Sequence, residues 1–229
     1  MTSPLPRRET KRLANHRKIL EAALRVFSEY GYSGTTMDAI SGEARLTKPT
    51  VYKYFDSKDK LFADMMIVRR DQMLLVFEKG TESEMVEQLF NFSWRYADTV
   101  MQPEFLSLAR LIIGEAQRFP EVGKAYQSAG PDRVLEGLMS HLEDYNSAGQ
   151  LEFDDAELAA QDLWGLILSA PRTQALHRPT MVIDHTLLSR YIHNGLKVFL
   201  KAYSTHVDTD LIKLETLIEQ SPQSASNQV

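Results

Sequence analysis

The chain contains no cysteine among its 229 residues, and this absence removes several kinds of chemistry. Disulfide bonds, thiol nucleophiles and the thiolate ligands of zinc and iron–sulfur sites are all excluded. Long apolar runs are also missing, because the longest, residues 163–171, is far shorter than the ~20 residues that a membrane-spanning helix needs. The first residues are basic and lack the apolar core of a secretory signal. We therefore expect a cytoplasmic protein without a membrane span.

The sequence also lacks sustained alternation of apolar and polar residues, which is the pattern of half-buried β-strands. Apolar residues instead recur at helical spacing, and prolines fall at helix starts or boundaries. The expected fold class is all-α. The predicted helices cover residues 19–30, 37–44, 48–55, 58–79, 82–99, 103–119, 120–129, 131–148, 154–177, 180–205 and 208–219.

Charge is distributed unevenly along the chain, whose formal net charge is −5. Residues 1–60 hold 12 Lys and Arg against 7 Asp and Glu, whereas the remainder holds 14 against 24. A basic N-terminal part on an acidic body is typical of a module that meets a polyanion. Within it, residues 1–12 are predicted to form a flexible basic arm, which either enters a minor groove or stays solvated.

Two short helices near residue 45 form a helix-turn-helix pattern. In the second helix, Val51 and Phe55 are four residues apart and are predicted to face the core. The N-terminus of this helix can attract phosphate, and side chains of its first turn can reach base edges. The residues predicted to face outward are Lys48, Pro49, Tyr52 and Lys53, and Thr50 stands near the helix start.

Three segments together resemble the TetR family of transcriptional regulators: residues 31–40 (GYSGTTMDAI), 47–55 (TKPTVYKYF) and 57–62 (SKDKLF). Residues 105–121, followed by Gly130-Pro131, further resemble the AefR-type C-terminal subfamily. The resemblance implies an all-α homodimer with two DNA-reading heads and a divergent ligand domain. On this basis residues 1–60 form the DNA-binding domain, 61–220 the effector-binding and dimerisation domain, and 221–229 a disordered tail.

The resemblance also implies roles for individual residues of the head. Thr36 and Thr47 match helix caps that contact phosphate, Tyr52 matches a phosphate-binding aromatic, and Lys58 matches a lysine that grips the DNA backbone. The complete set of expected DNA contacts is Thr36, Arg45, Thr47, Lys48, Pro49, Thr50, Tyr52, Lys53, Tyr54 and Lys58.

Arg45 departs from the family pattern because it occupies a turn position that usually holds glycine. If its φ is positive, the side chain costs on the order of 1 kcal/mol. Arg45 either compensates by touching a phosphate or is merely solvated. Gly42, inside the preceding helix, costs ~1 kcal/mol relative to alanine.

Apolar and aromatic residues of the body are expected to supply an effector pocket and a dimer interface. The alternative for both sets is packing inside one subunit. The expected pocket residues are Phe90, Trp94, Met101, Phe105, Leu108, Ile112 and Trp164. The expected interface residues are Gly165, Ser169, Leu188, Tyr191, Ile192, Gly195, Leu196, Phe199 and Tyr203, on helices that would form a four-helix bundle across a two-fold axis.

The leading hypothesis is a repressor that binds a pseudo-palindromic operator as a dimer and is released by a small, largely apolar effector. An enzyme has no support, since the nucleophile-elbow, P-loop, dinucleotide-binding and zincin motifs are absent. His177, His185 and His193 recur every eight residues, about 80° apart on a helix, so we expect no metal site and no cofactor. The alternative function is a helical partner-binding protein that has lost DNA affinity, which Arg45 and Gly42 would favour.

Overall fold

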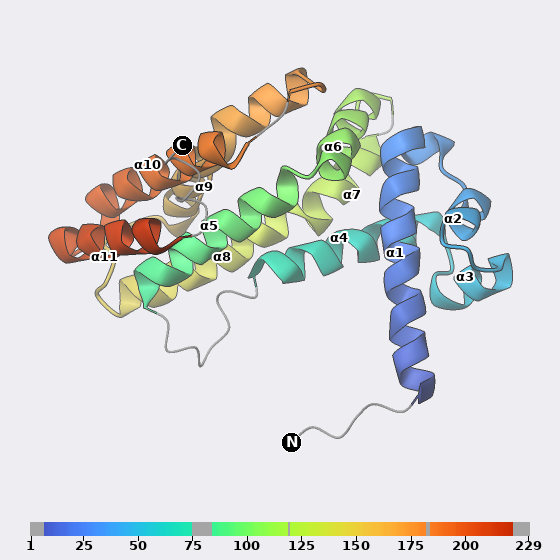
Figure 1. Cartoon of the computed structure of the whole chain (residues 1–229), viewed down its shortest axis with the longest axis horizontal. Helices are drawn as coiled ribbons and strands as arrows, with labels where there is room; N and C mark the ends of the chain where they lie inside the picture. The colour runs from blue at the N-terminus through green and yellow to red at the C-terminus, as the bar shows by residue number, and fades with distance from the viewer. Residues whose placement is uncertain (1–6, 75–83, 119, 182–183, 222–229) are drawn as a thin grey trace. The chain divides into compact units, whose positions relative to one another are not determined.

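The computed structural model describes residues 7–74, 84–118, 120–181 and 184–221, and within these ranges the chain is all-α, as predicted (Figure 1). An isolated antiparallel bridge joins Leu151 and Ser204. None of the described helices is long and apolar enough to cross a membrane. The helices are α1 (Arg7–Gly34), α2 (Met37–Glu43), α3 (Lys48–Tyr54), α4 (Lys58–Leu74), α5 (Met85–Val100), α6 (Pro103–Glu115), α7 (Pro120–Ala129), α8 (Pro131–Ser147), α9 (Ala156–His177), α10 (His185–Tyr203) and α11 (Val207–Gln220).

The predicted flexible arm is wrong for residues 7–12, which form the first turns of α1. Arg, Glu and Lys are good helix formers, and the guanidinium of Arg12 pairs with Glu9 at 2.7 Å, three residues earlier on the helix surface. Residues 1–6 of the arm, the predicted helical residues 75–79 and residues 222–229 of the predicted tail lie outside the described residues. Gly31, which directly follows the predicted helix 19–30, interrupts the helical geometry with φ 69°, although α1 extends to Gly34.

The chain forms two compact units that do not follow the predicted boundary at residue 60. Unit 1 consists of Met1–Arg69 and Pro103–Ala129, and unit 2 consists of Arg70–Gln102 and Gly130–Val229. Unit 1 therefore contains α6 and α7 in addition to the helix-turn-helix region. The reason is apolar packing, since α6 lies along α1 and buries one face there.

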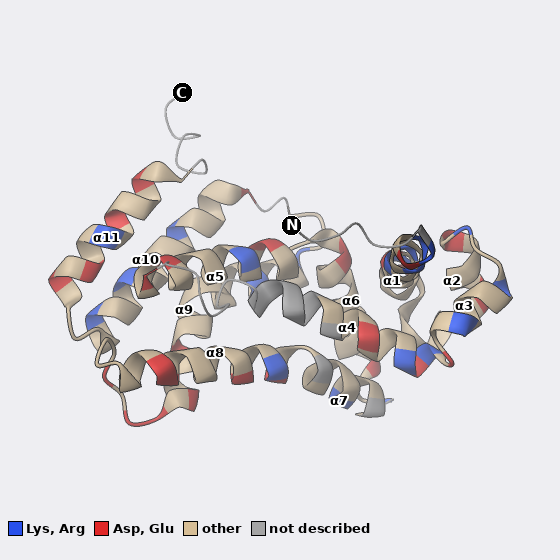
Figure 2. Ribbon diagram, turned by 90° about the horizontal axis from the view of Figure 1, so that it is seen from below, with Lys and Arg blue, Asp and Glu red and all other residues tan. Residues whose placement is uncertain are grey.

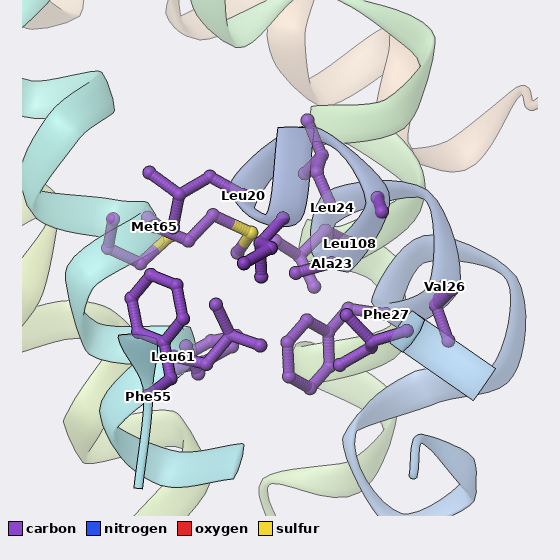
Figure 3. Close-up of a cluster of buried hydrophobic side chains, with 14 of the residues drawn as sticks. Leu20, Ala23, Leu24, Val26, Phe27, Phe55, Leu61, Met65 and Leu108 are labelled. Atoms are coloured by element: carbon purple, nitrogen blue, oxygen red, sulfur yellow. The ribbon is translucent and has the colours of Figure 1, made fainter. Parts of the chain in front are cut away.

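The core of unit 1 is built from α1, α3, α4, α6 and α7 together with α2 (Figure 3). Phe27 of α1 contacts Phe62 of α4 edge to face, with ring centroids 5.2 Å apart. Leu108 of α6 is completely buried in the same cluster. This core holds α2 and α3 against α1 and so fixes the orientation of the second helix of the pair.

Unit 2 is organised around α9 and α10, which pack against each other, with α5, α8 and α11 beside them. Gly195 allows the close approach of these two helices, because a Cβ there would lie 2.8 Å from the carbonyl of Leu166. Helices α9 and α10 begin later than predicted, at residues 156 and 185 rather than 154 and 180. In each, an aspartate caps the start: Asp155 accepts from Leu158 N, and Asp184 accepts from Leu187 N.

Candidate DNA-binding surface

The first helix of the pair, α2, starts and ends with defined caps. Thr36 Oγ1 accepts from Ala39 N at 3.1 Å, which confirms the predicted cap. At the other end, Arg45 N donates to Gly42 O and Leu46 N donates to Ser41 O, both at 3.0 Å. These two hydrogen bonds form the motif that commonly ends a helix with one residue in left-handed conformation.

Arg45 is that left-handed residue, with φ 52°, and among the described residues other than glycine it alone has a positive φ. The condition stated for this position is therefore met, and the strain is on the order of 1 kcal/mol for a residue with a Cβ. The next residue, Leu46, packs against the core of unit 1 and anchors the turn. The Arg45 side chain is exposed.

The second helix of the pair, α3, has one buried and one exposed face, as predicted. Val51 and Phe55 are both 0% exposed, while the Tyr52 side chain is 41% exposed. Lys48, Pro49 and Lys53 are also exposed; Figure 2 marks the basic residues of this region in blue. Pro49 lies in the first turn, where a missing N–H leaves no helical hydrogen bond unmade. The outer face of α3 thus presents hydroxyl and cationic groups.

Two threonines at the start of α3 bond to each other. Thr47 is the N-cap residue by position, but its side chain accepts no hydrogen bond from the helix backbone, so the predicted side-chain cap is wrong. Its Oγ1 lies 2.7 Å from Oγ1 of Thr50, which is partly buried. The Thr47 side chain therefore leaves the free N–H groups of the first turn unbonded. Such groups can bind an anion at the start of the helix.

Lys48 forms an ion pair that the sequence did not predict. Its Nζ lies 2.7 Å from Oδ1 and 3.0 Å from Oδ2 of Asp38, in the first turn of α2. The hydrogen bond to Asp38 and the charge of that carboxylate raise the pKa of the Lys48 ammonium, which therefore stays protonated at neutral pH. Asp38 holds the cation at the start of α3 and would compete with any phosphate for it.

Two of the predicted DNA contacts face the protein. Lys58 Nζ donates to Tyr32 O at 2.7 Å and to Thr35 O at 3.2 Å, and it lies 4.5 Å from the centroid of the Tyr32 ring. Tyr54 is half-buried, with its ring centroid 6.3 Å from that of His16. In this structure Lys58 secures the chain between α1 and α2, and Tyr54 covers the core beside α1.

The predicted pocket residues fall into both units. Phe105, Leu108 and Ile112 of α6 are buried in the core of unit 1 against α1. The other four belong to unit 2: Phe90 and Trp94 on α5 are buried and contact α10, Met101 follows α5, and Trp164 of α9 meets Tyr96 of α5 edge to face.

Most of the predicted interface residues on α10 are covered by their own chain, so their placement in an intersubunit contact is corrected. They lie on the face of α10 that packs inside unit 2, and helical spacing does not distinguish such a face from an intersubunit one. The buried residues are Leu188, Ile192, Gly195, Leu196 and Phe199. Gly165 and Ser169 on α9 are exposed, and Tyr191 and Tyr203 are partly exposed.

The fold and this surface define a class of protein, the helix-turn-helix DNA-binding regulators. Residues 19–65 match the family model of bacterial regulatory proteins of the tetR family. Residues 87–205, more than half of the chain, match the C-terminal domain of AefR-like transcriptional repressors. The chain therefore belongs to the TetR family of transcriptional regulators, as its sequence motifs predicted.

Individual relatives agree with this assignment. The HTH-type transcriptional regulator YhgD of Bacillus subtilis is 27% identical over 147 residues, which are 62% of this chain and 74% of YhgD. A TetR-family regulator from Mesorhizobium loti has a solved structure with 29% identity and a TM-score of 0.67, covering 84% of this chain and 98% of that one. The Flavonoid-responsive Regulator FrrA is 28% identical, with a TM-score of 0.62 and the same coverages.

Proposed function

We propose that this TetR-family regulator is a ligand-responsive repressor: it binds a pseudo-palindromic DNA operator as a homodimer and is released by a small, largely apolar effector. The observation that carries the DNA-binding part is the exposed face of α3, where Lys48, Tyr52 and Lys53 project while Val51 and Phe55 are fully buried. In a helix-turn-helix protein this helix enters the major groove, where first-turn side chains reach base edges. Such a regulator acts on DNA in the cytoplasm.

Phosphate contacts would come from groups around this helix. The exposed hydroxyl-bearing residues are Thr36, Thr47 and Tyr52, and Arg45 adds a cation at the turn. Lys58 and Tyr54 would contribute only after leaving their present contacts with unit 1. Lys48 would exchange Asp38 for a base or phosphate acceptor. Its contribution to the free energy of DNA binding is therefore the difference between the energies of these two electrostatic contacts.

The homodimer would form through exposed stripes on α9 and α10. Leu158, which is 58% exposed, shares helical spacing with Gly165 and Ser169 on α9. On α10, Val198 is 42% exposed and lies one turn from Asn194. Apolar and small residues at this spacing suit close helix packing across a two-fold axis.

One substitution on α10 and a control substitution on α11 test this interface. Val198→Glu is expected to convert the dimer to monomer in analytical ultracentrifugation, because it places a charge in the proposed contact. Ile212→Glu is the matched control, since Ile212 of α11 is likewise exposed but lies outside the proposed stripes. Equal effects of the two substitutions would contradict the assignment of the interface to α10.

Release by an effector is supported by relatedness. The family model names transcriptional repressors, and FrrA is described as flavonoid-responsive. An effector bound in the body would favour a spacing of the two heads that does not match two half-sites, with a coupling free energy of about 1–3 kcal/mol. The operator, as a duplex site read by a two-fold dimer, would have half-sites one helical turn or a multiple of it apart.

Selection of duplexes from a random pool, followed by titration at several salt concentrations, tests the DNA-binding part. Tyr52→Phe is expected to weaken all sequences equally, whereas Lys48→Ala also relaxes base preference at one position. Asp38→Asn is expected to act in the opposite direction, with tighter binding and a steeper salt dependence, because it frees the Lys48 ammonium. Lys213→Ala, which breaks an ion pair with Glu84 in unit 2, is the control without effect.

Absence of any selected sequence, together with affinity that does not fall with salt, would overturn this proposal. It would favour the helical partner-binding protein instead. The strained turn at Arg45 is the feature that suits that alternative, whereas the fully buried Ile40, Val51 and Phe55 show that the head retains an intact core.

A further inference from the structure

A cluster of ring side chains lies between α5 and α10 in unit 2. The Trp94 indole contacts His193 edge to face and stacks on His185, with ring centroids 6.0 Å apart in both pairs. The ring of Phe90 also stacks on His193, with the two centroids 6.0 Å apart. Four rings from two helices thus form one connected group of contacts in this unit.

Two polar atoms in this cluster are buried without a hydrogen bond to any described residue: Nε1 of Trp94 and Nε2 of His193. Trp94 is only 5% exposed, and its Nε1 is a donor only. Buried polar groups in native proteins are normally bonded, because an unbonded one costs free energy. Two such atoms on rings in direct contact are therefore unusual, and they point to a ligand oxygen as the shared partner.

The surroundings limit the charge of that oxygen. Ser189 Oγ lies 3.2 Å from Nδ1 of His193, which leaves Nε2 as the ring atom that faces a new partner. Burial and the nearby Lys197 lower the pKa of the His193 imidazole, which is neutral at physiological pH. Asp98 follows Trp94 by one helical turn, and burial raises the pKa of its carboxyl. The imidazole is neutral, and the nearby Lys197 ammonium is already paired with Glu215 at 3.2 Å, so neither offers a free positive charge to an anionic ligand.

We infer that the rings between α5 and α10 form a binding site for an uncharged aromatic compound whose oxygen substituent accepts from Trp94 Nε1 and bonds to His193 Nε2. A phenolic hydroxyl satisfies both atoms at once, since its oxygen accepts from the indole and its proton is available to the imidazole. The inference rests on the proposed function, because it supplies the chemical class of the effector. The aromatic ring of the ligand would pack against rings of this cluster.

The indole N–H signal of Trp94 in a nitrogen–proton correlation spectrum reports on this site directly. The chain has two tryptophans, so either Trp164→Phe or Trp94→Phe assigns the two signals. The probes are p-cresol; p-xylene, which has nearly the same shape without the oxygen; 4-methylcyclohexanol, which lacks the aromatic ring; and p-toluate, which is anionic. The titrations use the full chain without DNA.

Saturable binding of p-cresol, with a downfield shift of the Trp94 proton, is the expected result. The other three probes are expected to bind about tenfold more weakly, the difference that one good interaction contributes. His193→Phe keeps a ring and is expected to weaken p-cresol about tenfold, and Ser189→Ala serves as a milder second variant. A Trp94 signal that p-cresol leaves unmoved, or p-xylene binding as tight as p-cresol, would overturn the inference.

A parallel DNA titration separates this site from the proposed function. Saturation of the Trp94 signal by p-cresol without any change in DNA affinity would support the site and contradict the release of DNA by its ligand. Release of DNA by another compound that binds without moving the Trp94 signal would support the proposed function and contradict this site.

Discussion

Replacing Arg45 with glycine is expected to stabilise the head and to show whether its side chain meets DNA. The φ of 52° places a Cβ in the left-handed region, which costs roughly 1–2 kcal/mol in an L-residue. Glycine removes this strain but gains freedom in the unfolded chain, so the net stabilisation is about 1 kcal/mol. Arg45→Ala is the matched control, because it removes the same charge and retains the Cβ.

Urea unfolding followed by a tertiary-structure signal measures this difference. With a slope of about 1–3 kcal/mol per molar urea, Arg45→Gly should raise the midpoint by roughly 0.3–1 M at unchanged slope, and Arg45→Ala should not. Equal midpoints for the two variants would refute the strain assigned to this turn. In DNA titrations both variants lower the salt slope by about 0.9 if the guanidinium neutralises one phosphate, and neither does if it is solvated.

Five further substitutions test packing, hydrogen bonding and titration. Gly195→Ala should lower the free energy of unfolding by about 1–3 kcal/mol, because the new Cβ would meet the backbone of α9. Gly42→Ala should raise it by up to ~1 kcal/mol, because no atom lies within 4 Å of a Cβ at that position. Lys58→Met should lower the free energy of unfolding by about 1.5–3 kcal/mol, because two hydrogen bonds are lost. Lys60→Met is the control: its exposed ion pair with Asp56 contributes little, so the free energy of unfolding should change by less than about 1 kcal/mol. Burial raises the pKa of Tyr145 to about 12, so the folded state keeps the phenol proton to higher pH than the unfolded state, and the free energy of unfolding should fall as pH rises from 10 to 12. Tyr145→Phe should flatten that part of the pH profile, and an unchanged profile would contradict the raised pKa of Tyr145.

Features of the head that depend on neighbouring residues could be read from the sequence. The buried pair Val51 and Phe55 follows from spacing within one helix, and the cap at Thr36 follows from its place before an apolar run. The resemblance marked position 45 as one that usually holds glycine, and Arg45 has a φ of 52° there. Each of these conclusions needs only a few consecutive residues, which is why the structure confirms them.

Contacts between distant residues were not predictable in the same way. Lys58 donates to carbonyls more than 20 residues earlier in the chain, and no local pattern marks those acceptors. Asp38 lies in the first turn of α2, where an acidic residue is favourable because of the helix dipole. Its presence there therefore did not indicate an ion pair with Lys48. Backbone carbonyls and surface pairs are identified only once the fold is known.

Helical periodicity alone also led to a wrong prediction for α10, whose apolar face was assigned to the dimer interface. The apolar face of α10 was visible in the sequence, but α9 and α5 of the same chain cover it. His185 and His193 lie about 80° apart on an ideal helix, yet both rings contact Trp94 of α5, because side chains from two turns of one helix can reach toward the same residue of its neighbour. The size and position of the partner side chain decide such contacts.

The proposed function depends most on α3 entering a DNA groove twice in one symmetric complex. The natural absence of cysteine makes a direct test simple, because Lys53→Cys creates a unique site for an iron chelate that cleaves nearby DNA. On a selected duplex, we expect two cleavage centres related by a pseudo-dyad and separated by about 10 base pairs or a multiple of that distance. Uniform cleavage, or the same pattern from an identically labelled Ile212→Cys control on α11, would contradict it.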